Sequence, residues 1–495
     1  MAVKLRRPIL VGGIGLSFSL WMLQSLHHSA GQVGEFGMLG LLALGAGFWW
    51  FQQQTGKEID FSPLASPLER ETVEKAIAQA EAVVMQLETE AANHEANAQL
   101  RQQIAHVTAE LDRQEQRLSI TGGKGVGKTT LRGVLEDSWK SQQPQKLTLS
   151  ETPALFTATD ASERETMASE LAIASDLVLF VTAGDLTDPE FQTLRQLTAV
   201  HQRLLLVFNK QDQYLPEERF LVLQQIQQRM QGLIKTEDVV AIAAAPSPVK
   251  VRQHQEDGSV QERMEQPSAD LTLLTQSLNQ ILKQEGQQLV WASTFRAAVA
   301  LKAEAKTVLN GVRRDRALPV IEQYQWIVAA TAFANPVPAL DLLATAAINA
   351  QMVIDLGAIY QQKFSLQQAQ TLAGTMGSLM LKLGLVELST QTIGGILKSN
   401  AITFVAGGIA QGVSAAYLTR LAGLSLIECF QAQEVATTVE GNLLNLNQLG
   451  ETLQKVFQAN QRVAFLQSFV KQGVARLLPE SPQPEIAGDG TAVSC

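Results

Sequence analysis

A glycine-rich stretch decides the fold of this chain: residues 122–129 read Gly-Gly-Lys-Gly-Val-Gly-Lys-Thr. The stretch matches the phosphate-binding pattern G-x-x-x-x-G-K-[ST], in which backbone N–H groups and the start of the following helix hold phosphate oxygens. The short run Leu118–Ile120 comes directly before it and predicts the strand that such a loop must follow. The sequence therefore predicts an α/β nucleotide-binding domain.

The residue types in this loop predict what each position does. Glycines let the backbone approach a phosphate closely, the Lys128 ammonium would contact the β- and γ-phosphates, and the Thr129 hydroxyl would bind Mg²⁺. The nucleotide-binding residues predicted from this stretch are Gly122, Gly123, Lys124, Gly125, Val126, Gly127, Lys128, Thr129 and Thr130.

A second motif, Asn-Lys-Gln-Asp at residues 209–212, follows an apolar run at 204–208. The Asp212 carboxylate can accept two hydrogen bonds from guanine, one from N1–H and one from the exocyclic amine. Adenine cannot donate this pair, and a carboxylate that loses its buried partners costs free energy. The second motif therefore predicts that the nucleotide is a guanine nucleotide.

Apolar runs recur through the middle of the chain and alternate with helical patterns. The runs lie at residues 118–120, 146–149, 176–181, 204–208 and 239–243. Near-continuous apolar strands are typical of a parallel sheet that is covered on both faces. We therefore expect residues 118–285 to form a mostly parallel sheet with helices on both sides.

These motifs resemble those of a known class of proteins. The run Gly-Val-Gly-Lys-Thr-Thr-Leu that ends at Leu131, together with residues 209–212, resembles the Era-like, TRAFAC-class P-loop GTPases. The resemblance implies GTP or GDP and Mg²⁺ as ligands. It also implies that Asn209 supports the base and the loop, and that the stem of Lys210 packs over the base. The fifth motif of the class is weakly matched after the last apolar run, which predicts that the backbone N–H groups of Ala244 and Ala245 meet the guanine oxygen.

The chain departs from that class where the third motif, D-x-x-G, is expected. It has Glu-Thr-Pro-Ala at residues 151–154, so Glu151 would hold a Mg²⁺-bound water and Ala154 lacks the conformational freedom of glycine. Residues 131–146 are also too few for a helix, a full first switch and a second strand. The predicted catalytic residues are Lys128, Thr129 and Glu151, with Thr129 and Glu151 at the metal, and we expect slow, partner-assisted or absent hydrolysis.

Two apolar segments precede the nucleotide domain, at residues 9–26 and 33–51. Each is near the ~20 residues that span a bilayer as a helix. Three basic residues lie before the pair and Lys57 follows it, whereas the connecting loop has no Lys or Arg. This asymmetry predicts a transmembrane hairpin at residues 1–57 with both ends, and the GTPase domain, on the cytoplasmic side. A cleaved signal peptide is the alternative.

Helical patterns flank the nucleotide domain. In residues 58–117, apolar side chains recur at spacings of three and four with a register break at 93–97, which predicts a helical hairpin. This connector either packs as a stalk or associates with a second copy as a coiled coil. Residues 286–478 are predicted to form an all-α apolar domain, and 479–495 a disordered tail.

A stretch of the carboxy-terminal region, residues 335–360, resembles the YcjF-type domain of unknown function, and the resemblance extends over about 313–430. It implies a bacterial architecture in which this domain is joined to an Era-like GTPase. Asp341, Asp355 and Lys382 interrupt the apolar helices, and charges cost free energy in lipid. The helices therefore form either a soluble bundle or a unit that associates with the membrane.

Bulk properties exclude some classes of function. The net charge of −9 argues against a nucleic-acid partner, because phosphate backbones require a basic surface. Two cysteines in 495 residues cannot form a disulfide framework or a zinc site.

The sequence as a whole predicts a membrane-anchored GTP-binding protein. We expect a slow GTPase whose nucleotide state controls how the helical domain engages a membrane or a partner. The alternatives are a non-hydrolysing, nucleotide-stabilised membrane scaffold and, more remotely, a transporter-associated ATPase. The expected partners are GTP, a lipid membrane and a second copy bound through the helical regions.

Overall fold

The computed structural model describes residues 67–156, 161–254, 260–334, 338–399, 407–432 and 446–477. The described chain forms two compact units, one of residues 67–88 and 92–305, the other of residues 89–91 and the residues from 306 onward. The predicted membrane hairpin at 1–57 and the predicted tail at 479–495 lie outside the described residues.

The first unit is built on a five-stranded parallel sheet with the order β2-β1-β3-β4-β5. The strands are β1 (Gln116–Gly122), β2 (Leu147–Glu151), β3 (Leu177–Thr182), β4 (Leu204–Phe208) and β5 (Val239–Ala241). The parallel sheet and all five strands that the apolar runs predict are confirmed, although β5 is shorter than its run. The chain leaves β1 to one side for β2 and crosses to the other side for β3, so the strand order reverses between β1 and β3.

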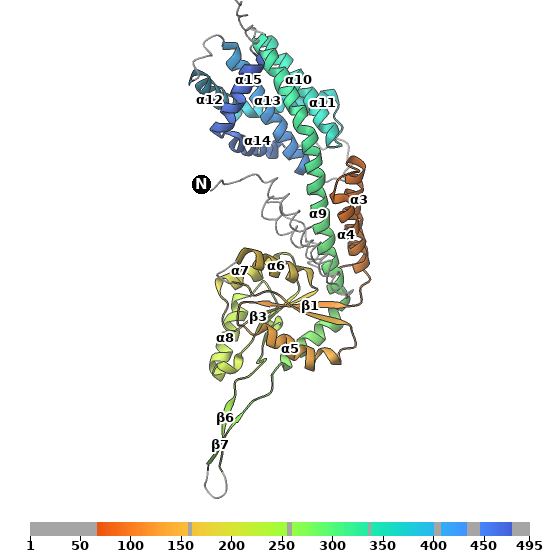
Figure 1. Ribbon diagram of the computed structural model, residues 1–495, viewed down its shortest axis with the longest axis vertical. Coiled ribbons are helices and arrows are strands. Elements are labelled where there is room, and N and C mark those ends of the chain that lie inside the picture. The colour runs from red at the N-terminus through yellow and green to blue at the C-terminus, as the bar shows by residue number, and fades with distance from the viewer. Residues whose placement is uncertain are drawn as a thin grey trace, which may run out of the picture. The chain divides into compact units, whose positions relative to one another are not determined.

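Helices cover both faces of this sheet, as expected (Figure 1). One apolar core joins the sheet to Leu131 and Leu135 of α5 and to Leu274 of α9, and a second joins its other face to α6, α7 and α8. The helices are α5 (Lys128–Ser138), α6 (Ala161–Ala174), α7 (Asp188–Ala199), α8 (Pro216–Arg229) and α9 (Thr272–Ala334), with short 3₁₀ turns η2 (Lys140–Gln142), η3 (Gln211–Gln213) and η4 (Thr236–Asp238).

Helix α9 runs without a break through residue 285, where the sequence analysis places a domain boundary. The compact units instead divide at residues 305 and 306. The first part of α9 belongs to the sheet unit because Leu282 and Leu289 are buried in its core and Glu285 pairs with Arg203 at 2.9 Å. The change in composition near residue 290 therefore lies within one continuous helix and precedes the change of packing unit at residues 305 and 306.

The connector is a helical hairpin, as predicted, formed by α3 (Arg70–Glu90) and α4 (Ala96–Glu110). Its apolar seam is buried, including Val84 and Leu87 of α3 and Leu100 of α4. Hydrogen bonds tie α3 and the segment before it to α9: Lys302 Nζ donates to Gln79 Oε1 at 3.1 Å, and Leu68 N donates to Gln288 Oε1 at 2.7 Å. The hairpin thus packs along α9 as a stalk, and self-association through it stays a prediction.

A two-stranded antiparallel hairpin between β5 and α9 was not predicted. It is formed by β6 (Val249–His254) and β7 (Val260–Glu265) and projects away from the five-stranded sheet (Figure 1). Its strands mix Lys, Arg and Glu with apolar residues, and Glu262 pairs with both Lys250 and Arg252. Such strands lack the apolar alternation by which a half-buried strand is recognised.

The second unit is helical, as expected. It contains the end of α9, α10 (Pro338–Ile359), α11 (Leu366–Lys382), α12 (Leu385–Ser399), α13 (Gly407–Ala432), α14 (Leu446–Asn460) and α15 (Val463–Leu477). Among the described helices, α13 alone is long and apolar enough by itself to cross a membrane, and 78% of its apolar window is buried inside the unit. A Cβ atom on Gly412 would lie 2.8 Å from Ala329 O of α9, so this glycine allows close helix packing.

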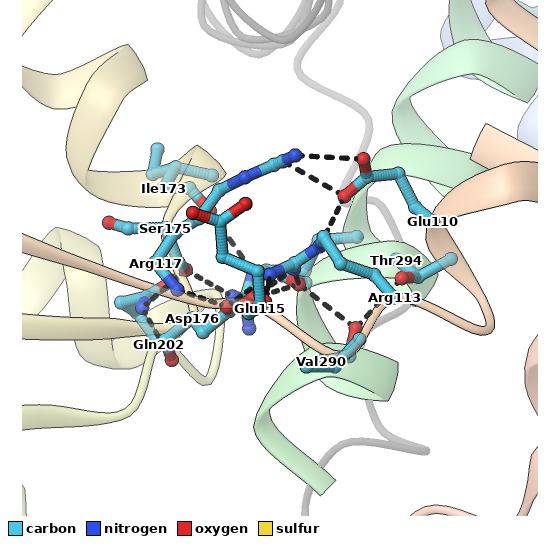
Figure 2. Close-up of polar contacts among 12 residues, drawn as sticks. Glu110, Arg113, Glu115, Arg117, Ile173, Ser175, Asp176, Gln202, Val290 and Thr294 are labelled. Atoms are coloured by element: carbon cyan, nitrogen blue, oxygen red, sulfur yellow. Dashed lines mark hydrogen bonds and ion pairs between the residues drawn. The ribbon is translucent and has the colours of Figure 1, made fainter. Parts of the chain in front are cut away.

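A buried ion-pair network fixes the end of the sheet at which β1 and β3 begin (Figure 2). The Asp176 side chain has no exposed surface. It accepts hydrogen bonds from Arg113 Nη1 and Nη2 at 2.9 and 2.7 Å, from Arg117 N at 2.7 Å, and from the Ser293 hydroxyl of α9. Glu110 of α4 pairs with both arginines. One carboxylate thus holds α4, β1, β3 and α9 together.

We predict that Asp176→Asn lowers the free energy of unfolding by about 3 kcal/mol, because it leaves the buried Arg113 guanidinium without its countercharge. Asp188→Asn is the control: this carboxylate also pairs with an arginine, Arg229, but its side chain is 90% exposed, so the change should cost under about 1 kcal/mol. Hydrogen exchange of the β1 and β3 amides measures both values. Equal effects of the two substitutions would show that the network does not fix the strands.

Candidate functional site

The candidate site lies at the carboxyl ends of the strands, where the strand order reverses. Gly122 ends β1 and is paired with Val181 near the end of β3. Ligands of open α/β sheets bind in the crevice outside such a reversal point. The loop of residues 123–127 leaves β1 there and leads directly into α5.

The backbone of this loop requires glycine at two positions. Gly122 has φ +145°, and a Cβ atom added to it would lie 2.2 Å from Val181 O. Gly127 has φ +95°, and its Cβ would lie 2.4 Å from Asn209 Nδ2. Both side-chain positions are therefore already filled by other parts of the protein, which explains the glycines in the motif.

The loop presents the start of a helix to solvent. Gly127 is the N-cap of α5 and provides no side-chain hydrogen bond, so the first N–H groups of α5 have no capping side chain. Lys124, Gly125, Thr129 and Thr130 are exposed around it. An exposed helix start with free N–H groups attracts anions such as phosphate.

Lys128 is buried within the loop. Its ammonium donates to Gly122 O at 3.0 Å and to Gly123 O at 2.8 Å. Burial lowers the pKa of this ammonium, and the nearby Glu151 carboxylate partly opposes the shift. A phosphate group placed in the loop would stabilise the charged form for the same electrostatic reason.

Thr129 and Glu151 meet across the site. The Thr129 hydroxyl donates to Glu151 Oε1 at 2.8 Å, although the two residues come from α5 and the end of β2. A hydroxyl and a carboxylate are oxygen ligands that suit Mg²⁺, which takes few protein ligands and fills its shell with water and phosphate. The described residues contain no cluster of three His, Cys, Asp or Glu side chains that could hold a metal by itself. The pair therefore fits a metal ion that arrives with a nucleotide.

The segment after β2 runs beside the phosphate loop. Leu155 N donates to Gly122 O at 3.2 Å, and Leu155 forms a parallel bridge with Gly123. Thr152 Oγ1 donates to Thr121 Oγ1 at 2.9 Å in the buried layer beneath. Ala154 lies in this segment, at the position of the glycine of the expected third motif. The sequence analysis missed the contact through Thr152, since a lone threonine carries no recognisable signal.

Between α5 and β2 the chain has room only for η2. No antiparallel strand pairs with β2 within the part of the chain that the structure describes, and β2 is the edge of the sheet. The short length of residues 131–146 predicts this absence of a full first switch.

The second motif contacts the phosphate loop directly. Asn209 Nδ2 donates to Val126 O at 2.9 Å, and Ala244 N donates to Asn209 Oδ1 at 3.0 Å. The Lys210 ammonium donates to Gly125 O at 2.8 Å. The two motifs, which are more than 80 residues apart in sequence, thus form one site.

Asp212 has one free carboxylate oxygen. Its Oδ2 accepts a hydrogen bond from Ser247 N at 3.0 Å, whereas its Oδ1 is buried and has no hydrogen-bond partner among the described residues. A buried carboxylate oxygen without a partner is unfavourable unless a ligand donates to it. Asp212 is therefore held in place by the protein and left with acceptor capacity for a ligand.

The structure changes the role of one predicted residue. The N–H group of Ala244 donates to Asn209, so Ala244 supports the motif and does not offer that group to a base. Ala245, which is exposed, stays a prediction.

Tyr214 was not among the residues predicted from the sequence. Its hydroxyl donates to Ala183 O at 3.0 Å, and its ring packs edge-on against Phe208, so it fixes the loop after β3.

Comparison with protein families finds one match, to a domain of unknown function, DUF697, at residues 300–462. The match covers the end of α9 and the helices α10 to α14. It includes less than half of the chain, so it identifies this region and does not classify the whole protein. No curated protein matches the chain.

Comparison with solved structures finds similarity to bacterial dynamins. LeoA, a bacterial dynamin GTPase from ETEC, is 11% identical, with 85% of this chain and 100% of that chain covered and a TM-score of 0.25. An oligomerised bacterial dynamin pair, described as a mechanism for long-range sensing and tethering of membranes, is 13% identical, with 86% and 85% covered and a TM-score of 0.21. At these TM-scores the similarity does not define the fold of this chain.

We predict that Gly127→Ala destabilises the loop by about 1–3 kcal/mol, because it forces alanine to a positive φ and against the Asn209 amide. Gly133→Ala is the matched control in α5, where a new Cβ would meet nothing within 4 Å. It should stabilise the helix by about 0.5–1 kcal/mol. Hydrogen exchange of the α5 amides measures both changes, and a stabilising Gly127→Ala would contradict the packing described here.

Proposed function

We propose that this chain is a GTP-binding protein of the Era-like, TRAFAC-class type that works at a membrane. In this proposal the sheet unit binds GTP or GDP with Mg²⁺ on the cytoplasmic side. Its nucleotide state controls how the helical unit, a YcjF-type domain, engages a membrane or a partner.

One observation carries the nucleotide part of the proposal. The phosphate loop and the Asn-Lys-Gln-Asp loop lie together at the strand-order reversal, and Asp212 Oδ1 is buried there without a partner. Guanine offers two adjacent donors, N1–H and the C2 amine, that a carboxylate accepts, whereas adenine has an unprotonated N1 and only a C–H at the corresponding positions. The free oxygen therefore favours guanine over adenine.

Different residues of the site would bind different parts of the nucleotide and its metal ion. The loop N–H groups and Lys128 would hold the phosphates, while Thr129 and Glu151 would hold Mg²⁺, which neutralises charge on the β- and γ-phosphates when bound. The third motif is replaced by Glu-Thr-Pro-Ala at residues 151–154, and only η2 lies between α5 and β2. We therefore propose slow turnover.

The membrane part of the proposal rests on the sequence and on the composition of the second unit. Two apolar segments near the start of the chain are each long enough to span a bilayer. In the second unit, α11 and α12 taken together are long and apolar enough to form one membrane segment. The two helices meet at an angle of 70°. Both features support contact with lipid.

We predict that Asp212→Asn lowers GTP affinity tenfold or more, about 1.4 kcal/mol per decade, and raises affinity for xanthosine triphosphate. Xanthine carries a carbonyl where guanine carries the amine, so an amide donor suits it and a carboxylate does not. Equilibrium titration of the purified protein with GTP, xanthosine triphosphate and ATP measures the switch. Unchanged GTP affinity, or competition by ATP as strong as by GTP, would refute the assignment of guanine.

A second candidate function is a non-hydrolysing scaffold that nucleotide binding stabilises. The altered segment at residues 151–154 and the missing first switch favour it, because both belong to hydrolysis more than to binding.

Phosphate release from GTP, measured with and without liposomes, separates the two candidates. For a slow GTPase we expect release above background that Glu151→Gln reduces about tenfold, since the metal site loses its charge. Glu136→Gln, which removes only a half-buried i,i+4 partner of Arg132 on α5, should leave release unchanged. No release under either condition, together with retained GTP binding, would establish the scaffold instead.

A further inference from the structure

The corner between α11 and α12 exposes large apolar side chains. Leu381, Leu383 and Leu388 are 67%, 38% and 48% exposed, and they lie around Gly384, which turns the chain with φ +70°. A single exposed leucine needs no explanation, but three within eight residues form a patch. The patch is at a helix junction and belongs to no pocket of the described unit.

The two helices carry few charges. From Leu366 to Leu397 the only charged residues are Lys382 and Glu387, and both lie close to the corner. The Glu387 carboxylate accepts a hydrogen bond from Gln391 at 3.0 Å. An exposed helical surface of a soluble bundle is normally rich in charge, so this surface is unusual for contact with water.

Five hydroxyl groups on these helices have hydrogen-bond partners within their own helix. Thr371, Thr375 and Ser378 of α11 donate to the carbonyl oxygens four residues before them, at 2.8–3.0 Å. Thr390 and Thr392 of α12 do the same, at 2.8 and 2.7 Å. Side chains that satisfy themselves within their own helix can enter a medium that offers no hydrogen bonds.

Packing inside the unit does not explain the exposed leucines. The opposite sides of α11 and α12 already supply the core through Leu372, Met376, Met380, Leu385 and Ile393. The core packing of these helices therefore does not use the corner leucines, whose apolar surface stays exposed.

We propose that this corner inserts into the interfacial layer of a lipid bilayer, with the leucines among the upper acyl chains and the Lys382 ammonium extended to the phosphate groups. The inference rests on the membrane engagement in the proposed function and names the surface that makes it. The long stem of lysine allows its charge to stay at the headgroups while its neighbours are buried.

The composition of the surface favours a bilayer over another protein. Lys382 lies beside the exposed Leu381 and Leu383, and the Glu387 carboxylate accepts a hydrogen bond from Gln391 of its own helix. A basic group beside exposed apolar side chains matches the anionic headgroups and the upper acyl chains of a membrane.

The test uses the full chain reconstituted into phosphatidylcholine–phosphatidylglycerol vesicles that contain an acyl-chain quencher lipid. An environment-sensitive fluorophore is attached at Leu383→Cys, or for comparison at Gln454→Cys on the exposed surface of α14, in a Cys495→Ser background; the remaining Cys429 is buried. We expect quenching at position 383 at least threefold stronger than at position 454. Equal quenching at the two positions would overturn the proposal.

Two variants sharpen the test. Leu381→Asn combined with Leu388→Asn should reduce quenching at position 383 about tenfold, because two apolar side chains leave the bilayer. Leu366→Asn is the matched control: Leu366 is 57% exposed on the same helix but lies one α11 length, ~25 Å, from the corner, so quenching should not change. An equal loss of quenching in both variants would overturn the proposal. A label that is shielded from water yet unquenched would show that a protein surface covers the corner, and it would also overturn the proposal.

Binding of labelled GTP is measured in the same samples. In the chain that keeps Leu381 and Leu388, a label at position 383 that is not quenched while GTP affinity is retained counts against the corner alone. Quenching without any GTP binding supports the corner and counts against the nucleotide part of the proposed function.

Discussion

The hydrogen bond from the Asn209 amide to Val126 O is the contact on which the candidate site depends. It places the Asn209 side chain where a Cβ atom of residue 127 would otherwise stand, so the phosphate loop must have glycine there. The other end of the same amide accepts from Ala244 N, which carries the contact on to the loop after β5. Three loops, each following a different strand, are thus fixed by one side chain, and neither motif has its shape without the other.

The sheet holds these loops because its strands are fixed at both ends. β1 and β3 begin at the Asp176 network and end at Gly122 and Thr182, beside the phosphate loop. Asp176 also binds Ser293 of α9, whose apolar side covers one face of the sheet. In the proposed function the site binds a flexible triphosphate, and loops mounted on such rigid elements would lose little ordering free energy on binding.

Much of this arrangement was predictable from the sequence, and the parts that were not have identifiable reasons. The strands follow from apolar runs and the phosphate loop from its glycines, which are local signals. The contact of Lys210 with Gly125 O was not predictable, because it depends on the left-handed backbone of Lys210, at φ +63°. The continuity of α9 was missed for a different reason: the composition changes near residue 290, whereas the helix continues and passes from one unit to the other only at residues 305 and 306.

The candidate site has the residues expected for nucleotide binding but lacks part of what is expected for hydrolysis. Lys128, Thr129, Glu151, Asn209 and Asp212 are all held in place by hydrogen bonds to the surrounding chain, whereas the path from α5 to β2 leaves no room for a full first switch. A ligand that binds the folded state stabilises it whether or not it is hydrolysed. At a concentration one hundred times its dissociation constant the gain is about 2.7 kcal/mol. This is a sizeable part of the stability of a typical domain, so occupancy alone can set the state of the sheet unit, and slow turnover would then act as a timer on that state.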